Sequence, residues 1–210
     1  ITGSVIKRKN ILTTIVLSSL VALPLACEAR TLASGTSGVI NTPSAYVRSM
    51  GHAAATYQYT EDYSVIGGNV AVMPGLEVAY SRWSPDAGDD FNMYSAKYMI
   101  LPETVASPAI AVGIEDATDE RDRSGYAVIS KAGPWGLKVH AGAGTGRFRD
   151  GFVALEKQFK VNSKSLNLGL AAEYDGDDFN YGMFVPVGKL MQAEVGVRDE
   201  KFYAGVHGTF

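Results

Sequence analysis

The chain has 210 residues, a net charge of -3 and 20% charged residues, so it has no excess of positive charge for neutralising nucleic-acid phosphates. Glycine is abundant, at 23 residues, and tyrosine reaches 11, while charged and apolar residues balance to a mean hydropathy of +0.01. This combination is unlike that of a helical membrane protein. We expect no nucleic-acid partner.

Residues 1–29 predict a secretory signal peptide. Residues 7–9 are basic, residues 11–25 are apolar, and Cys27 and Ala29 are placed for cleavage after Ala29. The apolar stretch is too short for a resident membrane-spanning helix. A second interpretation makes Cys27 a lipidated residue, although Pro24 stands where lipoprotein signals usually carry leucine. Cleavage after Ala29 is expected to leave a chain without cysteine and hence without thiol chemistry.

Residues 30–50 are rich in turn-forming residues and predict no regular strand. Asn41-Thr42-Pro43-Ser44 suits a tight turn, because proline fixes φ and the short polar side chains bond to their own backbone. Two interpretations remain open for this segment. It forms either a plug in the mouth of a barrel or a periplasmic leader that precedes the first strand.

The same segment carries a motif that resembles a known family. The motif residues are Gly38, Val39, Ile40, Asn41, Thr42, Pro43, Ser44 and Ala45. This stretch is similar to the opening motif of the YjbH-like family, although Tyr46 replaces the arginine that usually follows. The resemblance implies an outer-membrane β-barrel linked to exopolysaccharide and capsule production. Family members are often longer, so this chain resembles one minimal unit.

Residues 51–210 predict strands, because apolar and polar residues alternate between turn signals about every dozen residues. The alternation gives an all-β, antiparallel up-and-down transmembrane barrel of about twelve strands. The expected spans are 52–60, 64–73, 76–84, 91–100, 108–116, 125–132, 135–144, 151–159, 165–174, 178–186, 189–198 and 201–210.

Charge is distributed unequally among the expected connections. Odd-numbered connections hold most of the chain's 22 acidic residues, whereas the even-numbered ones are short and contain Glu103 as their acid. In an up-and-down barrel the odd and even connections lie at opposite ends. We therefore expect the acidic end to face outward from the cell and the other end to face the periplasm.

The end of the chain also favours a membrane barrel over a soluble β-sandwich. Tyr203, Gly205 and Phe210 lie in an alternating last strand and predict a C-terminal signal for the barrel-assembly machinery. Gly208 departs from this pattern, since an apolar residue is usual there. Lipids and lipopolysaccharide of an outer membrane are the expected surroundings.

One face of the expected strands carries charged and polar residues that would point into the lumen. The candidates are Glu77, Lys97, Glu115, Lys138, His140, Glu173, Glu194 and Arg198, accompanied by Gln58, Gln192 and His207. Buried charges require partners or water. The lumen is therefore either filled by paired charges or open as a narrow polar pore.

Sites for chemistry are sparse in the sequence. No cysteine or histidine spacing predicts a metal site, and no cofactor is expected. His140, Ser130 and Glu156 fall on neighbouring strands and could form a hydrolytic set at the membrane edge. A lumen histidine paired with a carboxylate is the simpler interpretation.

The sequence thus predicts a non-enzymatic outer-membrane barrel associated with exopolysaccharide or capsule export or envelope assembly, with polysaccharide or export proteins as partners. One alternative is a small porin-like channel or passive structural barrel. Another is a lipid-modifying enzyme.

Overall fold

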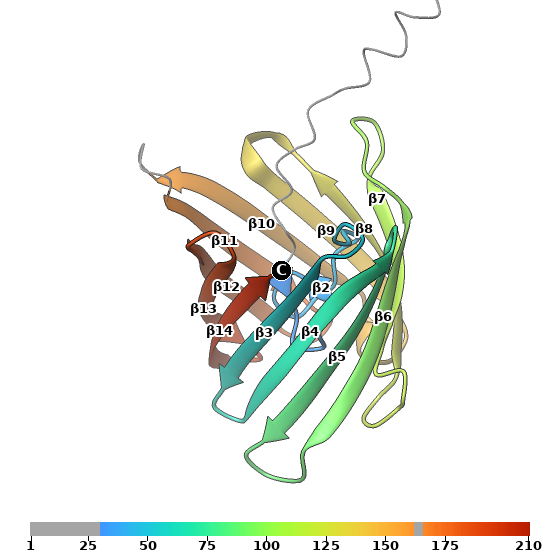
Figure 1. The fold of residues 1–210 in the computed structure, drawn as a ribbon, viewed down its shortest axis with the longest axis vertical. Coiled ribbons are helices and arrows are strands. Elements are labelled where there is room, and N and C mark those ends of the chain that lie inside the picture. The colour runs from blue at the N-terminus through green and yellow to red at the C-terminus, as the bar shows by residue number, and fades with distance from the viewer. Residues whose placement is uncertain (1–29, 162–165) are drawn as a thin grey trace, which may run out of the picture.

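The computed structural model describes residues 30–161 and 166–210, and the signal-peptide and Cys27 predictions lie outside these residues. Twelve strands, β3 to β14, form one closed barrel (Figure 1). Each strand pairs antiparallel with its neighbour in sequence, and β14 closes the circle on β3. The predicted fold class is therefore confirmed.

The observed strands match the predicted spans to within two residues at nearly every end. They are β3 Ala53–Thr60, β4 Tyr63–Met73, β5 Leu76–Pro85, β6 Phe91–Leu101, β7 Ala109–Glu115, β8 Ser124–Ala132, β9 Leu137–Gly144, β10 Phe152–Val161, β11 Leu166–Tyr174, β12 Phe179–Val187, β13 Met191–Arg198 and β14 Lys201–Thr209.

The prediction was wrong at the start of β9. Pro134–Gly136 forms a 3₁₀ turn (η1) where the alternation suggested strand. Proline lacks a backbone N–H and cannot donate to the ladder. Trp135 then takes a left-handed conformation with φ of 57°, so the strand begins only at Leu137. A second 3₁₀ turn, η2 Gly146–Phe148, precedes β10.

The barrel is polar inside and apolar outside. In β3 and β5 buried and exposed residues alternate along the strand. Outward positions hold large apolar side chains such as Ile66, which is 62% exposed, whereas inward positions hold buried charges such as Glu77 and Lys97. A soluble barrel has the opposite arrangement, so this pattern is that of a barrel surrounded by lipid.

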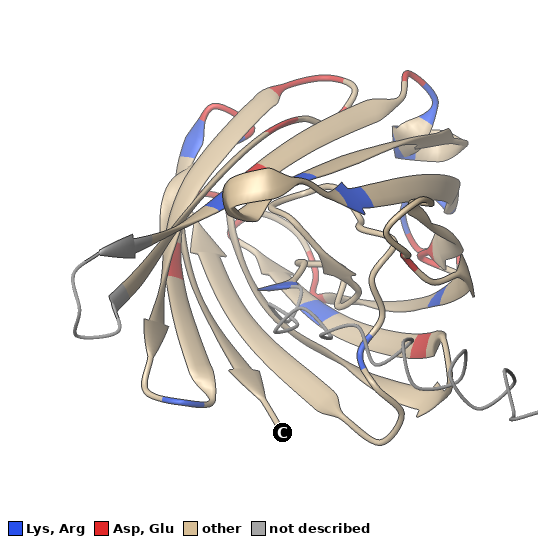
Figure 2. Ribbon diagram, turned by 90° about the horizontal axis from the view of Figure 1, so that it is seen from above, with Lys and Arg blue, Asp and Glu red and all other residues tan. Residues whose placement is uncertain are grey.

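The acidic connections gather at one end of the barrel (Figure 2). They join β3 to β4, β5 to β6, β7 to β8, β9 to β10, β11 to β12 and β13 to β14. We call this the acidic end, and the opposite end, with Pro74-Gly75 and the other even connections, the short-turn end.

Residues 30–48, which we call the inner segment, lie inside the barrel (Figure 1). Their two short strands, β1 Arg30–Thr31 and β2 Ser37–Gly38, pair only with each other. The apolar residues of the segment pack on the wall. Val39 and Ile40 are buried with Phe184 and Tyr203. The described part of the chain contains no helix long and apolar enough to cross a membrane.

Candidate functional site

The motif turn of the inner segment is held by one carboxylate from the wall. Glu173 in β11 accepts hydrogen bonds from the backbone N–H groups of Ile40 (3.1 Å), Asn41 (2.6 Å) and Thr42 (3.3 Å). It also accepts the Thr42 hydroxyl at 2.8 Å. Successive N–H groups that converge on one anion form a strong, charge-assisted contact. The motif thus provides a turn in which three successive backbone N–H groups and one hydroxyl point at Glu173.

Gly38 is required by the close approach of two parts of the inner segment. A Cβ atom there would lie 2.4 Å from the Thr42 carbonyl oxygen and 2.7 Å from the Leu32 side chain. Gly38 also bridges to Pro43, and the Val39 N–H closes the turn on Thr42 O at 2.9 Å. The turn predicted around residues 41–44 is therefore present and centred slightly earlier.

Gly38→Ala is expected to destabilise the folded barrel by about 1–3 kcal/mol, because the added methyl group must displace backbone atoms. The measurement is the unfolding midpoint, which is detected by the change in mobility on gels run without boiling. Gly133→Ala is the matched control, since a Cβ there meets only an ordinary contact at 3.6 Å. Equal midpoints for the two variants would contradict the assigned role of Gly38.

The side chain of Asn41 reaches the acidic end of the barrel. Its Nδ2 donates to Asp175 in the turn after β11 at 2.7 Å, and Asn180 donates to the same carboxylate at 2.9 Å. Burial alone would raise the pKa of Asp175, but hydrogen bonds from the Asp178 N–H and the two amides outweigh it and hold the pKa below its usual range.

A lowered pKa stabilises the fold where the carboxylate is charged. The contribution of Asp175 is therefore present at neutral pH and is lost as the pH falls through the lowered value, below about pH 4. We expect amide hydrogen exchange at residues 39–42, corrected for its intrinsic rate, to accelerate on acidification. Asp175→Asn should remove part of this dependence and Asp177→Asn should not. An unchanged profile in Asp175→Asn would disprove the assignment.

A second anchor holds the opposite side of the inner segment. Glu77 in β5 accepts the Ser37 N–H and hydroxyl, each at 2.7 Å. Lys97 in β6 donates to the carbonyls of Ser37 (2.6 Å) and Ser44 (3.0 Å), and its Nζ lies 3.7 Å from Glu77. Both charged side chains are almost fully buried. Carboxylate and ammonium therefore each bind the segment and each other.

The inner segment supplies buried cations to a wall rich in carboxylates. Arg30 lies 3.5 Å from Glu156 and 3.5 Å from Glu194, and its guanidinium stacks over the Phe184 ring. Arg48 donates to Asn69 at 3.2 Å. Neither arginine was among the residues predicted from the sequence. The excess of acids among the predicted lumen residues was the available signal, because buried carboxylates need cations.

Glu115, at the end of β7, connects the inner segment to the acidic end. It accepts the Ser34 hydroxyl at 2.8 Å and forms an ion pair with Arg147 at 2.7 Å. Arg147 also donates to the Asn41 carbonyl at 2.8 Å. The segment is thus bound along its length.

Ser130, His140 and Glu156 lie together, but inside the lumen and not at the lipid-facing edge where the hydrolytic hypothesis placed them. Ser130 Oγ lies 2.7 Å from His140 Nδ1, and His140 Nε2 lies 3.5 Å from Glu156. The Ala45 N–H donates to Ser130 Oγ at 2.8 Å. Inward-pointing positions of β8, β9 and β10 produce this arrangement. Ser130 and His140 are each 1% exposed, beneath the inner segment.

The remaining lumen candidates also point inward. Lys138 lies 3.4 Å from Glu156, Arg198 donates to Gln58 at 2.7 Å, and His207 lies 3.0 Å from Glu194. Lys138 and Glu156 thus pair charges of opposite sign, whereas Arg198 is bound by the neutral amide of Gln58. Among the described residues, no group of three or more histidine, cysteine or acidic side chains is arranged to hold a metal ion.

The residues of the predicted assembly signal differ in their surroundings. Tyr203 is buried in the lumen against Val39 and Ile40, and Gly205 makes room for Gln58 and Glu194. Phe210 is 69% exposed just beyond β14. Their role in assembly stays a prediction.

Comparison with solved structures finds the same fold in porins. A KdgM porin matches with a TM-score of 0.52 and 13% identity, over 76% of this chain and 99% of the porin. A KdgM porin in complex with disordered oligogalacturonate matches with a TM-score of 0.54 and 12% identity, over the same shares. These likenesses establish the fold alone.

A search of curated proteins gave no match. The family model YjbH, described as "Exopolysaccharide biosynthesis protein YbjH", matches residues 32–184. This range begins in the inner segment and ends within β12, so it contains the motif turn together with Glu77, Lys97 and Glu173. The chain therefore belongs to the YjbH family of exopolysaccharide biosynthesis proteins.

Proposed function

We propose that this chain is a non-enzymatic outer-membrane barrel that takes part in exopolysaccharide or capsule export, with its inner segment closing the lumen at rest. The observation that carries the proposal is the anchoring of a buried segment to polar wall residues on opposite sides of a closed barrel. Once the segment moves, the charged side chains that line the lumen can form direct or water-mediated hydrogen bonds with a saccharide.

Family membership and the acidic end support the membrane setting. The proposed signal peptide of residues 1–29 would export the chain, and Tyr203, Gly205 and Phe210 would address it to the assembly machinery. With the acidic end outward, the chain would contact lipopolysaccharide there and export proteins at the short-turn end. Oligogalacturonate is bound by the KdgM porin of the second structural match. For this chain it suggests a saccharide as the class of cargo.

Deletion and complementation in the parent organism provide the test. We expect the deletion strain to lose its surface polysaccharide and the wild-type chain to restore it. The restored chain should be found in the outer-membrane fraction. The barrel should also migrate faster on gels before boiling than after it. Unchanged polysaccharide in the deletion strain would reject the export role, and recovery of the chain as a soluble protein would reject the membrane placement.

A small porin-like channel is the second candidate, favoured by the fold shared with KdgM porins. It predicts steady conductance of the purified wild-type chain in a planar bilayer, without a polysaccharide phenotype. The third candidate, a lipid-modifying enzyme, is disfavoured, because Ser130 and His140 lie buried beneath the inner segment and away from lipid. It predicts phospholipid hydrolysis that His140→Ala abolishes.

A further inference from the structure

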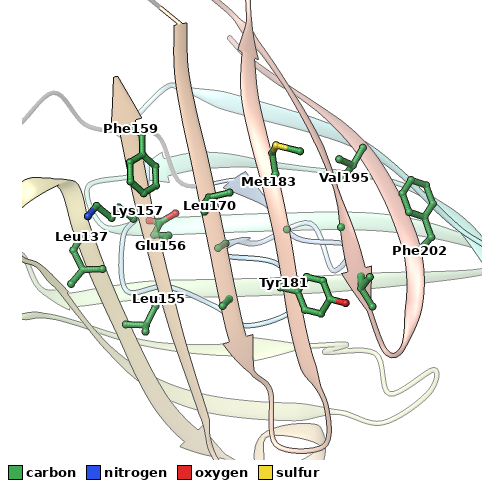
Figure 3. A pocket seen from close by; sticks show the side chains of 15 residues that line it. Leu137, Leu155, Glu156, Lys157, Phe159, Leu170, Tyr181, Met183, Val195 and Phe202 are labelled. Atoms are coloured by element: carbon green, nitrogen blue, oxygen red, sulfur yellow. The ribbon is translucent and has the colours of Figure 1, made fainter. Parts of the chain in front are cut away.

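The outer surface of the barrel is hollowed across β10 to β14 (Figure 3). The groove encloses about 670 Å³, within the usual range of small-molecule sites. Its lining includes the outward-pointing side chains of Leu155, Leu170, Met183, Val195 and Phe202. The small outward residue Ala172 lies among these larger side chains and leaves the wall uncovered there.

A cation lies on the β9–β10 side of this apolar groove. Lys157 points outward from β10 and lines the groove, with its Nζ 4.9 Å from the Phe159 ring centroid. Its partner in the register is Leu137, the first residue of β9. Lys157 therefore lies near the short-turn end, where the wall formed by β9 begins.

An exposed aromatic residue marks the same level of the barrel. Trp135, which is 85% exposed, belongs to the turn just before Leu137. Its neighbour Gly136 approaches β10 so closely that a Cβ would lie 3.3 Å from Gln158 O. Tryptophan is enriched where membrane barrels meet the headgroup layer. Lys157 is thus close to the level of Trp135, and the groove extends from Lys157 to Leu155 in the direction of the acidic end.

We propose that the groove binds one phospholipid of the periplasmic leaflet, with an acyl chain along Leu155, Leu170 and Met183 and the phosphate on the Lys157 ammonium. This inference rests on the membrane placement under the proposed function. A lysine on the lipid-facing side of a barrel is costly unless it lies near the interface or finds an anion. Phosphate supplies that anion. The neighbouring Glu156 carboxylate also lines the groove but is paired with Arg30 and Lys138 in the lumen, and most other acidic groups lie at the other end.

Native mass spectrometry of the detergent-released barrel tests the site, with phosphatidylglycerol and a diacylglycerol of the same chains as probes. Lys157→Gln is expected to lower phosphatidylglycerol occupancy about tenfold and to leave diacylglycerol unchanged. Ala172→Trp fills the groove and should lower the occupancy of both. Arg82→Gln is the matched control, because Arg82 is an outward-pointing cation near the acidic end, with a side chain 56% exposed.

Gel mobility without boiling confirms that each variant is folded before it is compared. Equal phosphatidylglycerol occupancy in wild type and Lys157→Gln would overturn the phosphate contact. Unchanged binding in Ala172→Trp would overturn the groove, and a dimer that disappears in this variant would show that a second copy occupies it. These outcomes leave the export role standing, because surface polysaccharide is measured separately and is expected to be normal in Lys157→Gln.

Discussion

Glu173→Ala is expected to release the motif turn from the wall. The lumen, which the inner segment blocks in the wild-type chain, should then conduct ions. The carboxylate accepts three backbone N–H groups and a hydroxyl from residues 40–42, and all of these donors lose their partner together. A buried donor left without an acceptor costs about 1–3 kcal/mol. The inner segment should therefore leave its position more often.

Two measurements follow this change. The unfolding midpoint should fall, and single-channel recordings should show frequent openings that the wild-type chain lacks. Glu173→Gln should give an intermediate result, because its amide keeps one acceptor oxygen but turns a donor group toward the N–H groups of the turn. Glu120→Ala, in the exposed connection after β7, is the control for removing an acidic side chain. Openings as rare as in wild type would show that Glu173 does not keep the lumen closed.

The strands could be predicted because the membrane imposes a simple rule on them. Each must span the bilayer with one face toward lipid, so alternation and turn residues together set the ends. The rule fails at Trp135, where Pro134 ends the ladder and a left-handed residue follows. No periodic signal describes such a turn.

Contacts of the inner segment could not be predicted in the same way. The motif turn and Glu173 are separated by more than 130 positions, and nothing local in either stretch indicates the other. Alternation places Glu173, Lys97 and Glu77 on the inward face of the strands, but it gives no information on which groups these side chains contact. Because the segment has no strand period of its own, its register against the wall depends on individual hydrogen bonds.

The contacts of Arg30, which belongs to the inner segment, could not be predicted from the sequence either. Arg30 lies immediately after the predicted cleavage position, in a stretch for which the sequence left both a plug and a periplasmic leader open. Its position between Glu156 and Glu194 follows only once the barrel is closed and these carboxylates require a cation. The lumen residues predicted from the sequence hold four glutamates against Lys97, Lys138 and Arg198, and this excess of one acid was the only signal for a further cation from the segment.

Lys97→Met is expected to destabilise the folded barrel by about 3–5 kcal/mol, because it leaves Glu77 buried without its cation. The carbonyls of Ser37 and Ser44 also lose their donor. Glu77→Gln alone removes the opposite charge and should be costly for the same reason. The unfolding midpoint and the protease sensitivity of the inner segment are the measurements.

Combining Lys97→Met with Glu77→Gln separates the ion pair from the hydrogen bonds to the segment. The double variant holds no unpaired charge, so it should be more stable than the sum of the single losses predicts. Full recovery to wild-type stability is not expected, since the two carbonyls still lack the Lys97 donor. Strictly additive losses of stability would show that the two charges act independently. The ion pair between Lys97 and Glu77, 3.7 Å apart, would then contribute nothing to holding the inner segment.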